Sequence, residues 1–280
     1  VNEIYDNFPD TTHFNMFVLK IIHDGTPLYL TGNSNYSELG ATVFDQHPIL
    51  SIKSGEIEKI EIKDILKDLE QEEINLTLKN NGDLIYDYLK IDQGVNYEDS
   101  KKMWAEMTPE LRRRFHEELI TTVAENAVAD GELITEYEKY PGRTKFRAKA
   151  SRYAVIDDQY MYCSIYSMFD GLLTFESSNR INPYDFDYWY DEQSTLNIKL
   201  PEQYELVSYP HSFEWHGPKS CGVIKIDSFY NATNHSLTLK GIASLRSAII
   251  PKHQYNHLLQ GERELSHPDR RILILKKKTM

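Results

Sequence analysis

The segment INLTLKNNGDLIYDYLKI, residues 74–91, decides the fold class because it has the pattern of two β-strands joined by a tight turn. Ile74, Leu76 and Leu78 alternate with polar residues, which is the period of a strand that buries one face. The pair Asn81-Gly82 follows and favours the backbone angles of a short hairpin turn. An apolar run from Leu84 to Ile91 then returns. The segment therefore predicts a β-hairpin.

The same pattern recurs along the chain. Near the N-terminus, Phe17 to Ile22 and Leu28 to Leu30 flank an Asp24-Gly25 turn, which predicts another hairpin. Short runs rich in aromatic and β-branched residues, separated by Gly, Pro, Asn or Asp, predict further strands. These runs are Leu133–Tyr140, Phe146–Ile156, Tyr160–Met168, Thr195–Leu200, Gly222–Phe229, Ser236–Gly241 and Ile272–Leu275. We therefore expect a mainly β (α+β) fold built as an antiparallel β-sandwich.

Two main helices are expected to interrupt the strands, near residues 100–126 and 251–265. In the first, Thr108 can cap the helix and Pro109 suits its first turn. The apolar residues that follow recur every four positions and predict one stripe facing the sheets: Leu111, Phe115, Leu119 and Val123. A shorter helix, from about Ser100 to Met107, is expected just before it. The second main helix should run from about Pro251 to Leu265, before Pro268.

Composition limits the class of protein. A chain of 280 residues can bury a substantial core, and a formal net charge of −12 disfavours a nucleic-acid surface. The basic cluster Lys276-Lys277-Lys278 is expected to be a solvated tail. No apolar run approaches the ~20 residues needed to span a bilayer. Because the sequence does not begin with Met, we expect either a removed leader or an excised piece.

The two cysteines, Cys163 and Cys221, are too few for a disulfide framework and too far apart for a CxxC motif. Both lie in apolar, strand-like stretches. They are expected to be small buried hydrophobic residues, and a single disulfide between them remains the alternative.

Motifs of catalysis and cofactor binding are missing. The sequence lacks GxSxG, a Walker loop and a dinucleotide fingerprint, so we predict no catalytic residue and no cofactor. His253 and His257 stand four residues apart on the expected C-terminal helix and could form a metal pair. Because no obvious third ligand accompanies them, the sequence favours a solvated or partly packed helix face, and we predict no metal site.

An aromatic and acidic segment, residues 184–192, is the candidate ligand-binding site. It could stack sugar rings or hold calcium through carboxylates, although the sequence favours a strand edge with buried aromatic residues. A glycan-binding module requires three of the aromatic residues to lie together on an open face: Tyr188, Trp189 and Trp215. Phe213 and Trp215 alternate as strand residues do, so core packing is the default interpretation for them.

Three stretches together resemble the C-terminal half of large exported bacterial proteins that carry a transglutaminase-like domain between β-sandwich domains. The first stretch is FNMFV (14–18), DG (24–25), YLTGNSNY (29–36) and LG (39–40). It is similar to the end of the family's catalytic core. The second is PYDFDY (183–188) with LNIKLPEQY (196–204), and the third is IPKHQY (250–255) with RILIL (271–275). The resemblance covers nearly the whole chain.

The departures from that family concern its catalytic residues. The family's His position is occupied here by Met16, and its Asp position by Thr31. A thioether cannot accept a proton near neutral pH, and a hydroxyl cannot stabilise an imidazolium as a carboxylate does. His13 is three residues away, which on a strand places it on the opposite face. The resemblance therefore implies a degenerate site, with any nucleophile upstream of this chain.

These observations predict two parts: residues 1–55 as the degenerate end of a transglutaminase-like sheet, and residues 56–280 as the C-terminal β-sandwich domain. We expect a non-catalytic accessory region of an exported protein, periplasmic or on the cell surface, that contacts protein or glycan and its own upstream transglutaminase-like domain. Two alternatives remain open. The chain could complete the cleft of a papain-like cysteine protease or acyl transferase, or it could be a carbohydrate-binding module.

Overall fold

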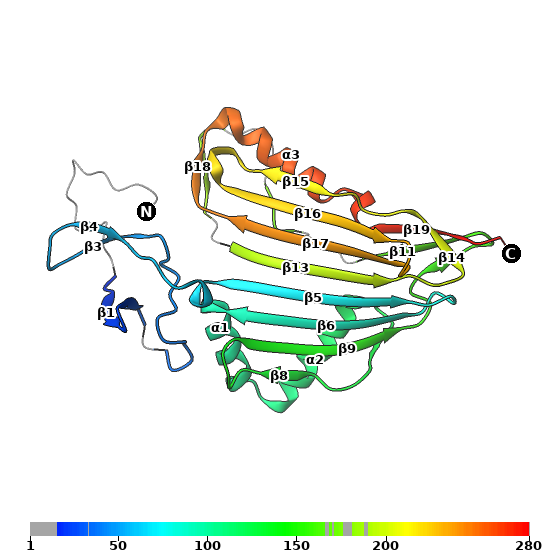
Figure 1. The fold of residues 1–280 in the computed structure, drawn as a ribbon, viewed down its shortest axis with the longest axis horizontal. Coiled ribbons are helices and arrows are strands. Elements are labelled where there is room, and N and C mark those ends of the chain that lie inside the picture. The colour runs from blue at the N-terminus through cyan, green and yellow to red at the C-terminus, as the bar shows by residue number, and fades with distance from the viewer. Residues whose placement is uncertain are drawn as a thin grey trace. The chain divides into compact units, whose positions relative to one another are not determined.

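The computed structural model describes residues 16–32, 34–165, 168–169, 171–175, 181–187 and 190–279. Over these residues the chain is mainly β, with three α-helices, one large mixed sheet and several smaller sheets (Figure 1). It divides into two compact units. The first contains residues 1–70, 91–107 and 135–143, and the second contains residues 71–90, 108–134 and 144–280.

The first unit contains two small antiparallel hairpins. Strands β1 (Leu19–His23) and β2 (Thr26–Leu30) form the first, which confirms the hairpin expected there. Its turn uses Asp24 and Gly25, which both have positive φ angles of 49° and 74°. Strands β3 (Pro48–Leu50) and β4 (Ile57–Lys59) form the second. A small buried cluster supports them and consists of Tyr29, Ile60 and Ile62; the 3-10 helix η2 (Asp64–Leu66) follows β4.

Helix α1 (Gly94–Glu106) belongs to the same unit and begins six residues before its expected start. Its first turn is held by side chains that are distant in sequence. The Asp68 carboxylate accepts a hydrogen bond from the Val95 N–H, and the Tyr140 hydroxyl accepts one from the Gly94 N–H at 3.0 Å. Gly94 itself has a φ of 63°, which suits glycine. No local capping residue marks this start, so the sequence could not reveal it.

The large sheet has nine strands. Eight of them follow the order β15 (Phe213–His216), β16 (Gly222–Asn231), β17 (Ser236–Leu245), β13 (Tyr190–Lys199), β5 (Leu69–Leu78), β6 (Leu84–Gln93), β9 (Gly142–Ala150) and β7 (Ala127–Ala129). The ninth, β8 (Ile134–Glu136), pairs with β9. Strands β5 and β6 are the hairpin expected from residues 74–91, with Gly82 at a φ of 80° in the turn.

The expectation of a wholly antiparallel sheet is wrong at one pair. Strands β5 and β13 lie side by side and run in the same direction (Figure 1). Two side-chain hydrogen bonds agree with this direction: Gln71 to Gln193 at 3.1 Å and Asn197 to Asn75 at 3.0 Å. In both pairs the β13 residue comes 122 positions after its partner on β5, and the offset stays constant only when two strands run the same way. The sheet is therefore mixed, and the alternation of apolar and polar residues along β5 does not distinguish the two directions.

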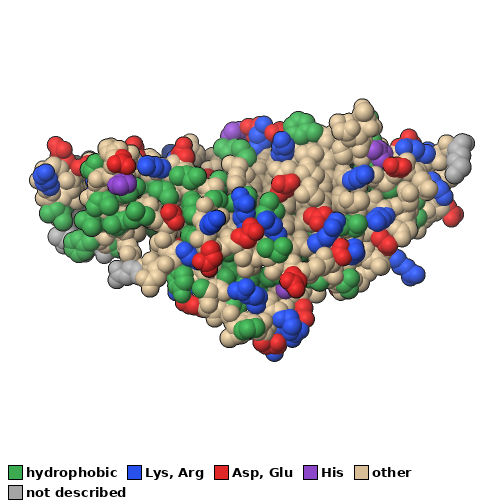
Figure 2. Space-filling model, turned by 60° about the horizontal axis from the view of Figure 1, so that its bottom comes forward, with side chains coloured by type: hydrophobic (Ala, Val, Ile, Leu, Met, Phe, Trp, Pro, Cys, Tyr) green, Lys and Arg blue, Asp and Glu red, His purple; other side chains and the backbone are tan. Residues whose placement is uncertain are grey.

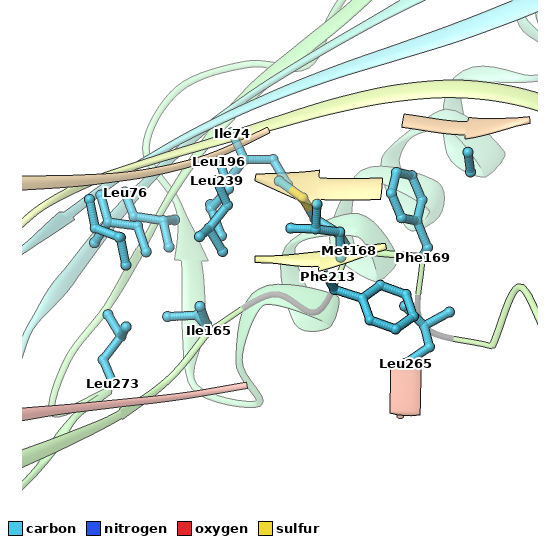
Figure 3. Close-up of a cluster of buried hydrophobic side chains, with 14 of the residues drawn as sticks. Ile74, Leu76, Ile165, Met168, Phe169, Leu196, Phe213, Leu239, Leu265 and Leu273 are labelled. Atoms are coloured by element: carbon cyan, nitrogen blue, oxygen red, sulfur yellow. The ribbon is translucent and has the colours of Figure 1, made fainter. Parts of the chain in front are cut away.

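Smaller sheets complete the second unit. One has the order β10 (Val155–Ile156), β11 (Tyr160–Ser164), β19 (Ile272–Lys277) and β14 (Tyr204–Ser208), and another pairs β12 (Tyr184–Phe186) with β18 (Ala248–Ile250). Inward side chains of the four-stranded sheet and of the large sheet share one hydrophobic cluster. In Figure 3, Ile165 and Leu273 face Leu76, Leu196 and Leu239 from the opposite side.

Helix α2 (Pro109–Val123) confirms its expected cap, because the Thr108 hydroxyl accepts a hydrogen bond from the Leu111 N–H at 3.3 Å. The apolar stripe expected along it is only partly correct. Leu119 and Val123 pack against the core, whereas Leu111 is 51% exposed and Ile120 is the residue that is buried. Helix α3 (Tyr255–Leu265) follows a 3-10 turn, η4 (Lys252–Gln254). None of the helices in the described part of the chain has the length and apolar character of a membrane span.

Candidate functional site

Met16 and Thr31, which the sequence resemblance aligns with a catalytic His and Asp, lie beside the first hairpin. Met16 precedes β1 and is exposed, and Thr31 directly follows β2. The Thr31 hydroxyl donates to the hydroxyl of Thr42 at 3.1 Å, and Thr42 is buried and accepts a further bond from the Phe44 N–H. Thr31 therefore fixes a loop of the first unit. His13, the local substitute considered above, lies outside the described residues.

The first hairpin carries a concentration of exposed apolar side chains. The burial pattern of β1 shows four exposed residues out of five. Figure 2 shows hydrophobic side chains gathered on the surface of this unit. The largest ones on and next to β1 are Phe17, which is 87% exposed, Leu19 and Ile22. We call these three residues the hairpin patch. A surface of this kind marks an interaction site more often than isolated exposed apolar residues do.

Two of the three residues expected to form an open aromatic face, Tyr188 and Trp189, lie outside the described residues. The third, Trp215, is 4% exposed and packs on helix α3. Its indole N–H donates to the backbone carbonyl of His257 at 3.4 Å, and a Cβ at Gly261 would come within 2.4 Å of the indole nitrogen. The expectation that Trp215 offers an open face is therefore corrected, because its ring fills the space beneath α3. Phe213 is buried as well.

The acidic side chains near that segment are bound by protein groups. Asp187 accepts from the Ser247 hydroxyl at 2.8 Å, and both carboxylate oxygens of Asp191 accept from Arg246, at 3.0 and 2.7 Å. Glu192 accepts from the hydroxyl of Tyr190. Across the described residues, no three His, Cys, Asp or Glu side chains are grouped as metal ligands. His253 lies in η4 and His257 in α3.

Both cysteines are free and buried, at 1% exposure for Cys163 and 0% for Cys221. This confirms the expected apolar role and shows that the alternative disulfide is absent. Burial raises the pKa of the Cys163 thiol to about 12 and that of Cys221 to about 11. At pH 8 both groups are therefore thiols, which are poor nucleophiles.

We expect neither cysteine to react with a thiol reagent such as dithionitrobenzoate at pH 8 in the folded chain, and both to react in 6 M guanidinium chloride. In the native state the reagent cannot reach the buried sulfur atoms, and the raised pKa values keep them as unreactive thiols rather than thiolates. The absorbance of released thionitrobenzoate measures the number of reacting thiols. A native thiol that reacts as fast as the denatured chain would show that one of the cysteines is accessible.

A group of four rings that the sequence analysis did not single out lies at the surface of the second unit. Tyr209 and His211 lie between β14 and β15, Tyr230 lies near the end of β16, and His235 lies in the turn before β17. Successive ring centroids are 5.5 Å apart for Tyr209 and His211, 6.2 Å for Tyr209 and Tyr230, and 6.4 Å for Tyr230 and His235. We call these four residues the aromatic strip. Only the clustering of Tyr and His at strand ends could have pointed to it.

Comparison with known proteins matches residues 161–275, from β11 to β19, to a domain family of unknown function with a solved structure, DUF3858. No curated protein matches the chain. Among solved structures, the chain is similar to one from Parabacteroides distasonis described as a "putative protease", at 12% sequence identity and a TM-score of 0.46. The similarity covers 92% of this chain and 35% of the other, so this chain spans about a third of that protein's length.

Proposed function

We propose that this chain is a non-catalytic β accessory region of an exported bacterial transglutaminase-like protein, and that its first hairpin docks on the transglutaminase-like domain of that protein. The observation that carries the proposal is the hairpin patch of Phe17, Leu19 and Ile22, which leaves three large apolar side chains in solvent. Fully burying a side chain of this size contributes about 1.5–3 kcal/mol. A partner that covers the patch would therefore gain several kcal/mol.

The strand pairing of the hairpin supports the same partner. Strand β1 pairs with β2 in a two-stranded sheet, so its second edge has no strand neighbour in the described part of the chain. A two-stranded hairpin is marginally stable in water and gains most from further strands or from packing. An open strand edge beside exposed apolar residues suits the sheet of a neighbouring β-containing domain. The sequence resemblance, which places this hairpin at the end of a transglutaminase-like sheet, supplies the identity of that domain.

The residues beside the hairpin support a docking role without catalysis. Met16 offers a thioether where the family has its base, and Thr31 is engaged with Thr42 rather than with an imidazole. Neither group can activate a cysteine nucleophile. The first hairpin would then keep the strands of the family's sheet without its catalytic groups, which suits it to docking on the transglutaminase-like domain rather than to catalysis.

The proposal is tested in the full-length parent protein with the double substitution Phe17→Ser and Ile22→Ser. Because both side chains would leave an apolar interface, we expect the thermal midpoint of the transglutaminase-like domain to fall by several degrees, measured by differential scanning calorimetry. The matched control is Phe229→Ser with Ile242→Ser, two exposed residues of the same types on the large sheet.

The control pair should leave that midpoint within about a degree, since surface substitutions usually change stability little. An equal midpoint in the two double variants would contradict docking through the hairpin patch. If the parent instead shows cysteine-dependent turnover that the hairpin substitutions abolish without lowering the midpoint, the chain completes a catalytic cleft, and the proposal is wrong.

A further inference from the structure

Hydrogen bonds orient two of the four rings of the aromatic strip, Tyr230 and His235. His235 Nε2 lies 3.0 Å from the carbonyl oxygen of Pro201, which can only accept, so this nitrogen carries the proton. In the neutral imidazole the other nitrogen, Nδ1, is then an acceptor. The Tyr230 hydroxyl lies 3.3 Å from Nδ1 and must donate to it. The Tyr230 oxygen therefore keeps its lone pairs, with which it can accept a hydrogen bond from a ligand.

The loops around the strip are ordered as well. The backbone carbonyl of His235 accepts from the Leu200 N–H at 3.0 Å, although His235 has a positive φ angle of 49°. Arg270 stacks on Phe213, with its guanidinium carbon 4.2 Å from the ring centre, and donates to the backbone carbonyl of His211 at 3.3 Å. The rings of Tyr230 and His235 and the backbone at His211 are thus positioned in advance of any ligand, which lowers the entropy that binding would cost.

Several exposed side chains next to the strip are uncharged and polar. Tyr230 is 36% exposed and His211 is exposed, while Tyr209 and His235 are half-buried. The turn beyond Tyr230 adds exposed amides and a hydroxyl from Asn231, Thr233 and Asn234. The Asn231 side-chain oxygen accepts from the N–H groups of Thr233 and Asn234, at 2.9 and 3.0 Å, and so orders this turn.

Ring faces bordered by neutral hydrogen-bonding groups match the chemistry of a sugar, which has apolar C–H faces and hydroxyls at its edge. Four rings in successive contact offer more than one position for a sugar, which suits a chain of them. A nucleic acid is disfavoured because the protein carries a net charge of −12. We propose that the aromatic strip of Tyr209, His211, Tyr230 and His235 binds uncharged polysaccharide, with the Tyr209 and Tyr230 rings as the stacking surface.

This inference does not rest on the docking of the first hairpin, since the strip lies in the second unit and is tested in this chain alone. The experiment is native gel electrophoresis of the 280-residue chain in gels cast with hydroxyethyl cellulose, arabinoxylan or galactomannan. We expect at least one of these neutral polysaccharides to retard the protein. Substitutions Tyr209→Ala and Tyr230→Ala should each weaken the retardation at least tenfold, because each removes one stacking ring.

Two further variants separate a binding role from a structural one. His211→Ala changes an exposed side chain and should weaken binding without changing the thermal midpoint. His235→Asn keeps a residue that tolerates the positive φ angle but removes the ring that orients Tyr230, so binding should weaken about threefold to tenfold. Phe229→Ala, an exposed aromatic ring on the opposite face of β16, is the matched control and should bind as the wild type does.

Unchanged migration in all three gels would overturn the proposal. Equal retardation of the wild type and of the Tyr230→Ala and His211→Ala variants would also overturn it, because binding would then take place elsewhere on the chain. If Tyr230→Ala does not fold, His211→Ala and Tyr209→Ala decide the question, with far-ultraviolet circular dichroism as the check on folding.

Discussion

Replacing Ile74 by Ala is expected to lower the free energy of unfolding by about 2–5 kcal/mol. Ile74 is completely buried on β5, and in Figure 3 it lies beside Leu196 of the neighbouring strand β13 and Leu239 of the next strand, β17. Truncation removes buried methyl groups and leaves a cavity, because the surrounding strands are fixed by their pairing and relax only partly. Urea denaturation followed by circular dichroism measures the change.

The matched control for this experiment is Ile242→Ala. Ile242 lies on β17 of the same sheet but is 48% exposed, on the face opposite the core. We expect a loss below about 1 kcal/mol there, since little apolar area returns to water. Similar losses at Ile74 and Ile242 would show that the face of the sheet assigned to the core is not the buried one.

Replacing Gly261 by Ala is expected to destabilise the chain by about 1–3 kcal/mol, although Ala is the better helix former by about 1 kcal/mol. Gly261 lies within α3, and an added Cβ would meet the indole ring of Trp215 at 2.4 to 2.8 Å. Either the helix or the ring must then move. Urea denaturation gives the stability change, and tryptophan fluorescence reports a change around Trp215.

The control here is Asn256→Ala, an exposed position in the first turn of the same helix. It should be neutral or stabilise the chain by a few tenths of a kcal/mol, because propensity alone acts there. A stabilising Gly261→Ala substitution would mean that α3 does not rest on Trp215. The ring would then be free to act in ligand binding, as the sequence first indicated.

The sequence predicted the features that depend on local chemistry. Asp24 and Gly25 have positive φ angles in the first turn and Gly82 has one in the second, so both hairpins were identifiable from their Asp-Gly and Asn-Gly pairs. Thr108 caps its helix through a backbone group three residues away. In each case the signal and its structural effect lie within a few residues.

Features that depend on distant residues were not predictable. The parallel pairing of β5 with β13 joins positions 122 residues apart, and a single sequence does not record such a register. The early start of α1 depends on Asp68 and Tyr140, which lie well outside the helix. The aromatic strip likewise gathers side chains from two loops and a strand end, and none of the four residues forms a motif alone.

For the candidate sites too, local sequence signals were predictable and contacts between distant residues were not. Trp215 and Phe213 alternate with exposed residues along β15, and both are buried. This local pattern predicted the position of Trp215 better than its assignment to an open aromatic face did. Met16 and Thr31 were identified through the resemblance, whereas the engagement of Thr31 with Thr42 required the fold. The hairpin patch was also beyond the sequence, since Leu19 and Ile22 read as ordinary strand residues.

The most direct test of the central claim, that the β1–β2 hairpin docks on the transglutaminase-like domain, is amide hydrogen exchange of β1. The exchange of residues 19–23 is compared between this chain alone and the full-length parent protein, with strand β17 as the internal reference. Docking should slow the exchange of β1 at least tenfold in the parent and leave β17 unchanged. Equal exchange of β1 in the two proteins would contradict the proposed function.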